Sequence, residues 1–192
     1  MIIYNSLDDL KIEMPLCIAL GSFDGLHKGH QKLIKRCIEL AKKEGLKPAV
    51  FSFSNHPLDA IKGEGSVRKI LSPQKKAHIL EDMGVELLIA PLFTREIMAL
   101  SPEAFIKNII LDHMDMKHAV CGFNYSFGYK AEGKPKDLRR LGRKYGYLTT
   151  VVREYRINGI TASSTHLRQF IEEGDEAAYK EFTGRDLKED LK

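Results

Sequence analysis

The sequence lacks several features that mark common classes of protein. It contains no tryptophan, and aromatic residues make up 8% of its 192 residues, which disfavours a carbohydrate-stacking site. No apolar run approaches the roughly 18 residues that a membrane-spanning helix needs. The N-terminal stretch MIIYNSLDDLKIE carries acidic residues where a secretory signal has a basic region. We therefore expect a cytoplasmic protein with no membrane partner.

Cysteine is scarce, with three residues far apart in the chain: Cys17, Cys37 and Cys121. Their number is odd and no CxxC pair is present, so neither a disulfide framework nor a zinc site is indicated. Two phosphate-binding fingerprints are also missing, the dinucleotide motif GxGxxG and the P-loop motif GxxxxGK[ST]. We predict reduced, buried thiols and no metal site made by the protein alone.

The excess of positive charge is small. Lysine and arginine number 30 against 26 aspartate and glutamate residues, so the formal net charge is +4. The basic residues are spread along the chain rather than clustered, which argues against nucleic acid as a partner. Such a charge is compatible with small anionic partners such as phosphates. The length suits one domain with its own core.

Short apolar runs alternate with amphipathic stretches along the chain. Apolar runs of five to seven residues alternating with helices are typical of a parallel sheet covered on both faces. We therefore predict an α/β fold with a doubly wound, five-stranded parallel sheet. The predicted strands lie in 15–21, 49–53, 85–91, 118–122 and 147–152, and the predicted helices in 31–44, 72–84, 101–113, 135–146, 163–174 and 175–183.

The fold class predicts where a ligand binds. In open parallel sheets, ligands bind in the crevice outside the carboxyl ends of the strands. Functional residues are therefore expected in the segments that directly follow the apolar runs. Four segments meet this rule: 21–30, 53–59, 122–133 and 158–168.

The first of these segments contains two histidines, His27 and His30, separated by Lys28 and Gly29. Residues three apart at a helix start lie on the same side of its first turn, where free N–H groups attract anions. Gly29 places no side chain between them, so a phosphate group can approach the backbone. The simpler alternative is a pair of surface histidines on a capped helix. A zinc site is disfavoured because no third ligand lies at a suitable spacing.

The sequence of this segment, GSFDGLHKGH, resembles the first motif of the nucleotidyltransferase superfamily. Its Phe-Asp-Gly is similar to the same part of the motif in the bacterial FAD synthetases. Other motifs follow in family order, over about residues 15–185. They are FSFSNHP at 51–57, GVE at 84–86, LSPEAF at 100–105, GFNYSFG at 122–128 and SSTHLR at 163–168. The resemblance implies a Rossmann-like nucleotidyltransferase fold.

The resemblance also implies roles for individual residues. It makes His27, His30 and Arg168 catalytic. It places ATP against Gly21, Ser22, Phe23, Asp24, Gly25, Gly29, Ser163, Ser164 and Thr165, and the flavin against Asn55, Pro57, Asn124 and Phe127. The simpler alternatives are that the serines are ordinary helix caps, Arg168 a solvated side chain and Asn124 a turn residue.

The implied reaction is adenylyl transfer from ATP to FMN, with Mg²⁺, which gives FAD and pyrophosphate. The FMN phosphate is already an anionic nucleophile, so positioning and charge stabilisation supply the catalysis. Two alternatives stay open: a nucleotidyltransferase with another acceptor, such as phosphopantetheine or nicotinate mononucleotide, and a non-enzymatic flavin or nucleotide sensor.

Two further expectations concern the architecture. Family members usually continue into a riboflavin kinase domain, and we expect residues 1–192 to form a single FMN adenylyltransferase domain with no riboflavin kinase activity. We expect residues 186–192 to form a frayed, charged tail, because chain ends are often poorly ordered. We also expect both histidines of the first motif to lie near solvent.

Overall fold

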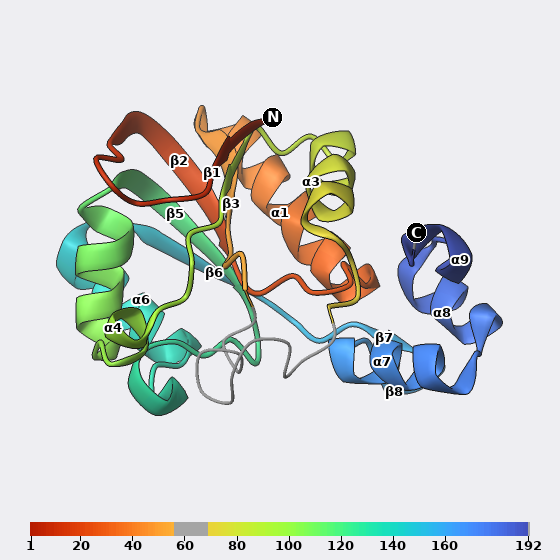
Figure 1. The fold of residues 1–192 in the computed structure, drawn as a ribbon. Coiled ribbons are helices and arrows are strands. Elements are labelled where there is room, and N and C mark those ends of the chain that lie inside the picture. Colours follow the sequence, from red (N-terminus) through yellow and green to blue (C-terminus); the bar gives the residue numbers. More distant parts are fainter. Residues whose placement is uncertain (56–68, 192) are drawn as a thin grey trace.

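A six-stranded, entirely parallel sheet runs through the protein in the order β1-β4-β3-β2-β5-β6 (Figure 1). The computed structural model describes residues 1–55 and 69–191. The predicted parallel α/β sheet is confirmed. Its strands are β1 (Ile2–Tyr4), β2 (Ile12–Leu20), β3 (Lys47–Phe51), β4 (Leu87–Ile89), β5 (Met114–Gly122) and β6 (Leu148–Val152).

The sheet has one strand more than predicted. β1 is the extra one, and it pairs in parallel with β4 at the edge of the sheet, with Ile3 opposite Leu88. It is only three residues long, and Ile2 and Ile3 are 52% and 45% exposed. So short a strand, without an alternating or fully buried pattern, has no periodicity by which the sequence can reveal it.

Helices cover both faces of the sheet, because successive strand residues point to opposite sides. Cys17, Ala19 and Val50 pack with α1, α3, α7, α8 and α9, whereas Ile18, Leu20 and Phe51 pack with α4, η1 and α6. Figure 1 shows α1 and α3 on one side of the sheet and α4 and α6 on the other. The first group is α1 (Lys28–Glu44), α3 (Pro73–Asp82), α7 (Ser164–Glu173), α8 (Glu176–Thr183) and α9 (Leu187–Asp190). The second is α4 (Arg95–Met98), the π-helix η1 (Phe105–Leu111) and α6 (Pro135–Tyr145); the short α5 (Pro102–Ala104) leads into η1.

Three smaller elements flank the strand ends. β7 (Arg156–Ile157) and β8 (Ile160–Thr161) form an antiparallel hairpin between β6 and α7, and η2 (Tyr129–Ala131) is a 3₁₀ turn after β5. The three cysteines are buried and unpaired, as predicted. In the part of the chain that the structure covers, no helix combines the length and the hydropathy needed to cross a bilayer.

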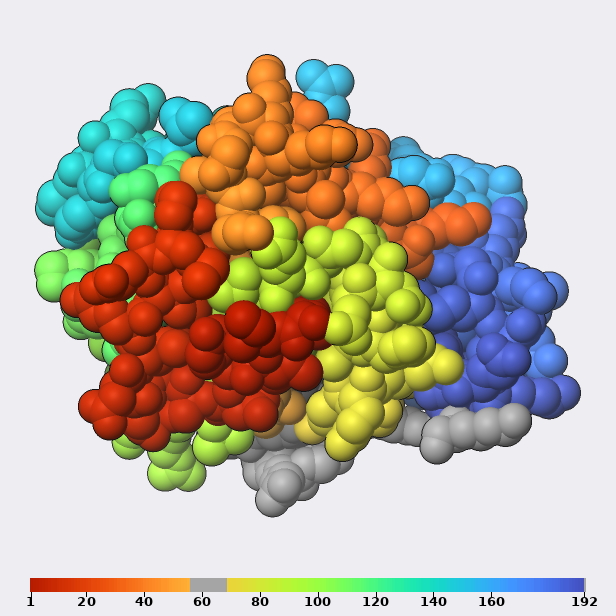
Figure 2. Space-filling view, turned by 90° about the horizontal axis from the view of Figure 1, so that it is seen from above, coloured from red at the N-terminus to blue at the C-terminus, as the bar shows by residue number. Residues whose placement is uncertain are grey.

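The expectation of a frayed C-terminal tail is wrong. Residues Leu187–Asp190 form α9, and Leu187 and Asp190 are only 7% and 5% exposed. In Figure 2 the blue C-terminal segment lies against the body of the molecule, and Asp190 lies within 4.0 Å of Lys75 on α3. The charges of this segment suggested a solvated tail, but one of them, Asp190, is buried and paired with Arg185, which only the tertiary structure shows.

Candidate functional site

A cleft of about 640 Å³ opens at the carboxyl ends of β2, β3, β5 and β6, where the fold class places ligand sites. Three groups of described residues line it: the turn after β2 with the start of α1, the loops after β3, β4 and β5, and the segment from the end of β6 to the start of α7. Among the predicted site residues, those on its lining are Gly21, Ser22, Phe23, His27, Gly29, His30, Asn124, Phe127, Ser163, Ser164 and Thr165.

The two histidines of the first motif lie together at the start of α1. His27 is the N-cap of this helix, and its Nδ1 accepts a hydrogen bond from the backbone N–H of His30 at 3.2 Å. The two imidazoles are stacked with their centroids 3.6 Å apart. A Cβ at Gly29 would lie 3.0 Å from His27 Nδ1, so glycine leaves room for the imidazole to turn back over the helix. Because Nδ1 of His27 accepts, its Nε2 carries the proton and can donate to a ligand.

The expectation that both histidines lie near solvent is wrong for His27, which is 6% exposed. Burial lowers the pKa of His27 from 6.5 to about 4. Burial, with smaller effects from His27 and Lys76, also lowers the pKa of His30 well below its usual value. Both rings are therefore neutral N–H donors at neutral pH in the free protein, since a buried ring disfavours the charged form.

This desolvation predicts a loss of stability in acid. Between about pH 6.5 and 4 the unfolded chain binds a proton at residue 27 that the folded protein does not, so the free energy of unfolding falls as the pH drops. From about pH 7 to about pH 5 the loss due to His27 is on the order of 2 kcal/mol. Urea unfolding at both pH values checks this result. His27→Asn should lose less stability than the wild type by about that amount, and equal losses would contradict it.

The turn that carries these histidines has an unusual backbone. Phe23 and Leu26 have φ of 50° and 43°, and Gly25 between them has φ of 75°. Positive φ in non-glycine residues costs of order 1–3 kcal/mol each and persists only where the surroundings hold it. Phe23 and Leu26 are fully buried, which holds the turn in place. Such strain is often found at functional sites.

A second helix starts beside the first. Ser163 is the N-cap of α7. A Cβ at Gly29 would lie 3.6 Å from the Cβ of Ala162, so the residue before this cap lies against the start of α1. Ser164 Oγ donates to the carbonyl of Asp24 at 2.7 Å, which ties α7 to the turn after β2. Neither helix carries an acidic residue in its first turn. Two helix N-termini without a carboxylate in their own first turns therefore meet at the cleft, and together they favour an anion.

Arg168 and Asp24 do not line the large cleft but lie next to it. The Arg168 guanidinium forms an ion pair with the Asp24 carboxylate, whose other oxygen accepts from the N–H of Ile70 at 3.3 Å. The side chains of Arg168 and Asp24 are 25% and 15% exposed. Arg168 and Ser164, which were predicted to share a site, both contact Asp24 through their side chains.

Lys76 is a site residue to which the sequence assigned no role. Its Nζ donates to the carbonyl of Ser22 at 2.7 Å and to Ser52 Oγ at 2.8 Å. It thus joins α3 to the turns after β2 and β3. Burial lowers the pKa of Lys76 to about 8, although the Asp24 carboxylate acts in the opposite direction. Only its position between two strand ends distinguishes it from the neighbouring lysines.

Aromatic side chains form another wall of the cleft. Phe53 packs against Phe93 with a centroid distance of 4.8 Å, and Phe105 packs against Phe127 at 6.0 Å. All four residues line the cleft together with Asn124, whose side chain is exposed. Of these aromatic residues only Phe127 had a predicted role. Phe53 lies in the predicted segment 53–59 but had no role assigned to it, and Phe93 and Phe105 lie outside the four predicted segments.

Asn55, which was predicted to contact the flavin, lies outside the large cleft. It lines a separate cavity of about 240 Å³ together with Asp24, Lys69 and Lys76, and not the large cleft. Its amide is occupied by Phe93, with Nδ2 donating to the carbonyl at 3.1 Å and Oδ1 accepting from the N–H at 2.7 Å. Asn55 therefore holds the loop that carries Phe93. Pro57 lies outside the described residues.

Fold and cleft together define a parallel α/β protein with a cleft at the carboxyl ends of its strands, where two helix N-termini lie beside an aromatic wall. Residues 10–166 match the FAD synthetase family, and the chain belongs to that family. Bifunctional riboflavin kinase/FMN adenylyltransferases are similar to it: the Listeria monocytogenes protein is 37% identical over 82% of this chain and 50% of its own length, and the Bacillus subtilis protein 32% over the same shares. The chain thus spans about half the length of the curated relatives it matches.

Solved structures show the same fold. A Streptococcus pneumoniae protein described as a macrolide-efflux protein superposes with a TM-score of 0.84 at 27% identity, over 97% of this chain and 62% of its own. The pantoate-beta-alanine ligase of Francisella tularensis superposes with a TM-score of 0.55 at 16% identity, over 94% of this chain and 78% of its own. The second likeness concerns the fold alone.

Proposed function

We propose that this chain transfers the adenylyl group of ATP to FMN. A phosphate oxygen of FMN attacks the α-phosphorus of ATP, the bond from that phosphorus to the bridging oxygen breaks, and pyrophosphate leaves with the electron pair. The observation that carries the proposal is the cleft itself, where two helix N-termini meet beside an aromatic wall. Membership of the FAD synthetase family supports it.

The ATP phosphates bind at the two helix starts. His27 Nε2–H and the His30 ring donate to phosphate oxygens, and the first-turn N–H groups of α1 and α7 add partial positive charge. Both rings are neutral in the free protein and donate an N–H to the phosphates. A bound triphosphate raises the pKa of both rings, because nearby negative charge favours the protonated imidazole. Arg168, beside Asp24, supplies a fixed positive charge for the leaving pyrophosphate.

The flavin binds against the aromatic wall. Phe53, Phe93, Phe105 and Phe127 offer a surface on which a flat ring system can stack, and Asn124 offers an amide to its polar edge. Asn55 acts through Phe93, which it holds by two hydrogen bonds. This arrangement favours a flavin over an acceptor without a large ring.

The side chains fit a magnesium ion that is held mainly by ATP. Mg²⁺ usually keeps several waters and takes one or two carboxylates plus substrate phosphates. Asp24 and Glu154 are the carboxylates that line the two cavities, and both are engaged, Asp24 by Arg168 and Glu154 by Arg156 at 2.9 Å. When bound with ATP, the ion neutralises phosphate charge. The protein's part is to orient the phosphates.

The test is direct. Purified protein with ATP, Mg²⁺ and FMN is expected to yield FAD and pyrophosphate, measured by chromatography with flavin fluorescence. Chelation of Mg²⁺ should abolish the product. FMN bound without FAD formation would indicate a flavin sensor, and turnover only with nicotinate mononucleotide or phosphopantetheine would indicate another acceptor. Either result would overturn the proposal.

Riboflavin provides the matched control substrate. We propose that residues 1–192 act as one FMN adenylyltransferase domain, because the described elements all pack around one sheet or flank its strand ends. Riboflavin with ATP is therefore expected to give neither FMN nor FAD with this polypeptide. Formation of FMN would show a kinase site within these residues.

A further inference from the structure

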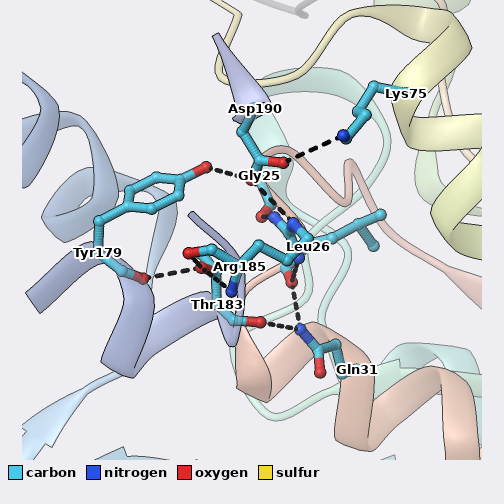
Figure 3. A network of polar contacts seen from close by, with 8 residues as sticks. All are labelled: Gly25, Leu26, Gln31, Lys75, Tyr179, Thr183, Arg185 and Asp190. Carbon is cyan, nitrogen blue, oxygen red and sulfur yellow. Dashed lines mark hydrogen bonds and ion pairs between the residues drawn. The ribbon is translucent and has the colours of Figure 1, made fainter. Parts of the chain in front are cut away.

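The C-terminal segment directly contacts the backbone of the turn after β2, at Gly25 and Leu26. Arg185 Nη2 donates to the carbonyl of Gly25 at 2.7 Å, and its Nη1 donates to the carbonyl of Leu26 at 3.2 Å (Figure 3). These two carbonyls belong to the two residues that directly precede His27 in the chain. The side chain that holds them comes from the short stretch between α8 and α9, about 160 residues later.

Asp190 fixes the other side of this guanidinium. Its Oδ2 accepts from Arg185 Nε at 2.8 Å and from the hydroxyl of Tyr179 at 2.7 Å. The Asp190 side chain is 1% exposed and that of Arg185 17%. A carboxylate this deeply buried is costly unless it is paired and hydrogen-bonded, so the fold has to supply these partners. Burial also raises the pKa of Tyr179, which keeps its hydroxyl protonated as a donor.

A second bridge joins the same two segments. Gln31 Nε2, on the first turns of α1, donates to the carbonyl of Leu26 at 2.9 Å and to that of Thr183 at 2.7 Å. Figure 3 shows Gln31 and Arg185 approaching Leu26 together. The carbonyl of Leu26 thus receives two donors, and it belongs to a residue with φ of 43°. A strained backbone persists only where its surroundings hold it, and these donors are such surroundings.

We propose that Arg185 and Asp190 are a positioning pair for the nucleotide site. Arg185 holds the carbonyls of Gly25 and Leu26, Asp190 holds Arg185, and the turn in consequence aims His27 and the first N–H groups of α1 at the phosphates. The segment Thr183–Asp190 is then a working part of the site and not an appended tail. The nature of the ligand rests on the proposed function, but the effect on the turn does not.

The test compares Arg185→Ala, Arg185→Lys and Asp190→Asn with Lys180→Ala. Lys180 forms an exposed ion pair with Asp186 at 2.8 Å in the same segment and is the matched control. Two measurements are made without turnover: hydrogen–deuterium exchange of residues 21–31 in the free protein, and the Kd of a non-hydrolysable ATP analogue. Thermal melting monitors the fold.

Arg185→Ala is expected to speed exchange in 21–31 and to weaken the analogue's binding by about tenfold or more, since charge-assisted hydrogen bonds are lost. Arg185→Lys should recover part of both, because lysine keeps the charge without the forked donors. Lys180→Ala should change neither. If Arg185→Ala fails to fold, Asp190→Asn, which keeps the shape and weakens the pair, should give a smaller change in the same direction.

Two outcomes would overturn the positioning role: unchanged exchange in 21–31, or faster exchange with an unchanged Kd, which would make the contact structural only. Neither outcome depends on FAD formation. If the wild-type protein makes no FAD, but the variants show the expected changes in exchange and Kd, the proposed function is contradicted and the positioning role stands.

Discussion

His27→Asn is expected to lower the turnover number for FAD formation about 10²-fold, which corresponds to about 2.7 kcal/mol of transition-state stabilisation. The asparagine oxygen can still accept from the N–H of His30, so α1 keeps its cap. What is lost is the Nε2–H donor at the phosphates. His30→Ala should reduce turnover to a similar degree. Initial rates of FAD formation at saturating ATP and FMN measure both effects.

Two comparisons separate chemistry from folding. His27→Ala removes both cap and donor, so it should also lose about 1 kcal/mol of stability relative to His27→Asn. His78→Ala, at an exposed histidine paired on the surface with Asp82, should leave turnover unchanged. Wild-type turnover in both His27→Asn and His30→Ala would show that the histidine pair has no part in the reaction.

Arg168→Ala should lower kcat/KM for ATP about 10²-fold, because a partly buried charge that serves the phosphates is removed. Arg168→Lys should recover only part of this loss, since lysine lacks the planar fork. Isothermal titration with an ATP analogue and steady-state kinetics measure binding and turnover separately. Full recovery by lysine would show that charge alone matters at this position.

Asp24→Asn distinguishes two ways in which Arg168 can act. If Arg168 works by holding the turn through Asp24, this variant should lose activity as Arg168→Ala does. If the guanidinium itself contacts the phosphates, the neutral amide leaves it available, and ATP binding should persist or tighten. The second result is expected, because the turn keeps its other contacts, from Ser164, Lys76 and Arg185.

The main elements of the fold could be predicted because their signals are local. Five apolar runs marked five strands, and caps such as Ser72 and Ser101 marked helix starts; both accept a bond from the N–H three residues on. The edge strand β1 gave no such signal. The helix predicted over 101–113 is present as α5 and a π-helix, a variation in hydrogen bonding that apolar periodicity does not reveal.

The candidate site was predictable in part. The motifs located the residues at the carboxyl ends of the strands, and most of them line one cleft. Phe53, Phe93 and Lys76 could not be assigned, because their roles come from neighbours far away in the chain. The flavin contact predicted for Asn55 stays a prediction; the structure adds that its amide holds the backbone of Phe93.

The sequence by itself determined the α/β class, the family and the positions at which the strands deliver side chains, because apolar periodicity and ordered motifs are properties of neighbouring residues. Only the tertiary structure decided the state of those side chains. Burial makes His27 a neutral donor and a cap, and a pair formed by Arg185 and Asp190 holds the turn that carries it. Desolvation and long-range hydrogen bonds arise when distant segments meet, so no local pattern contains them.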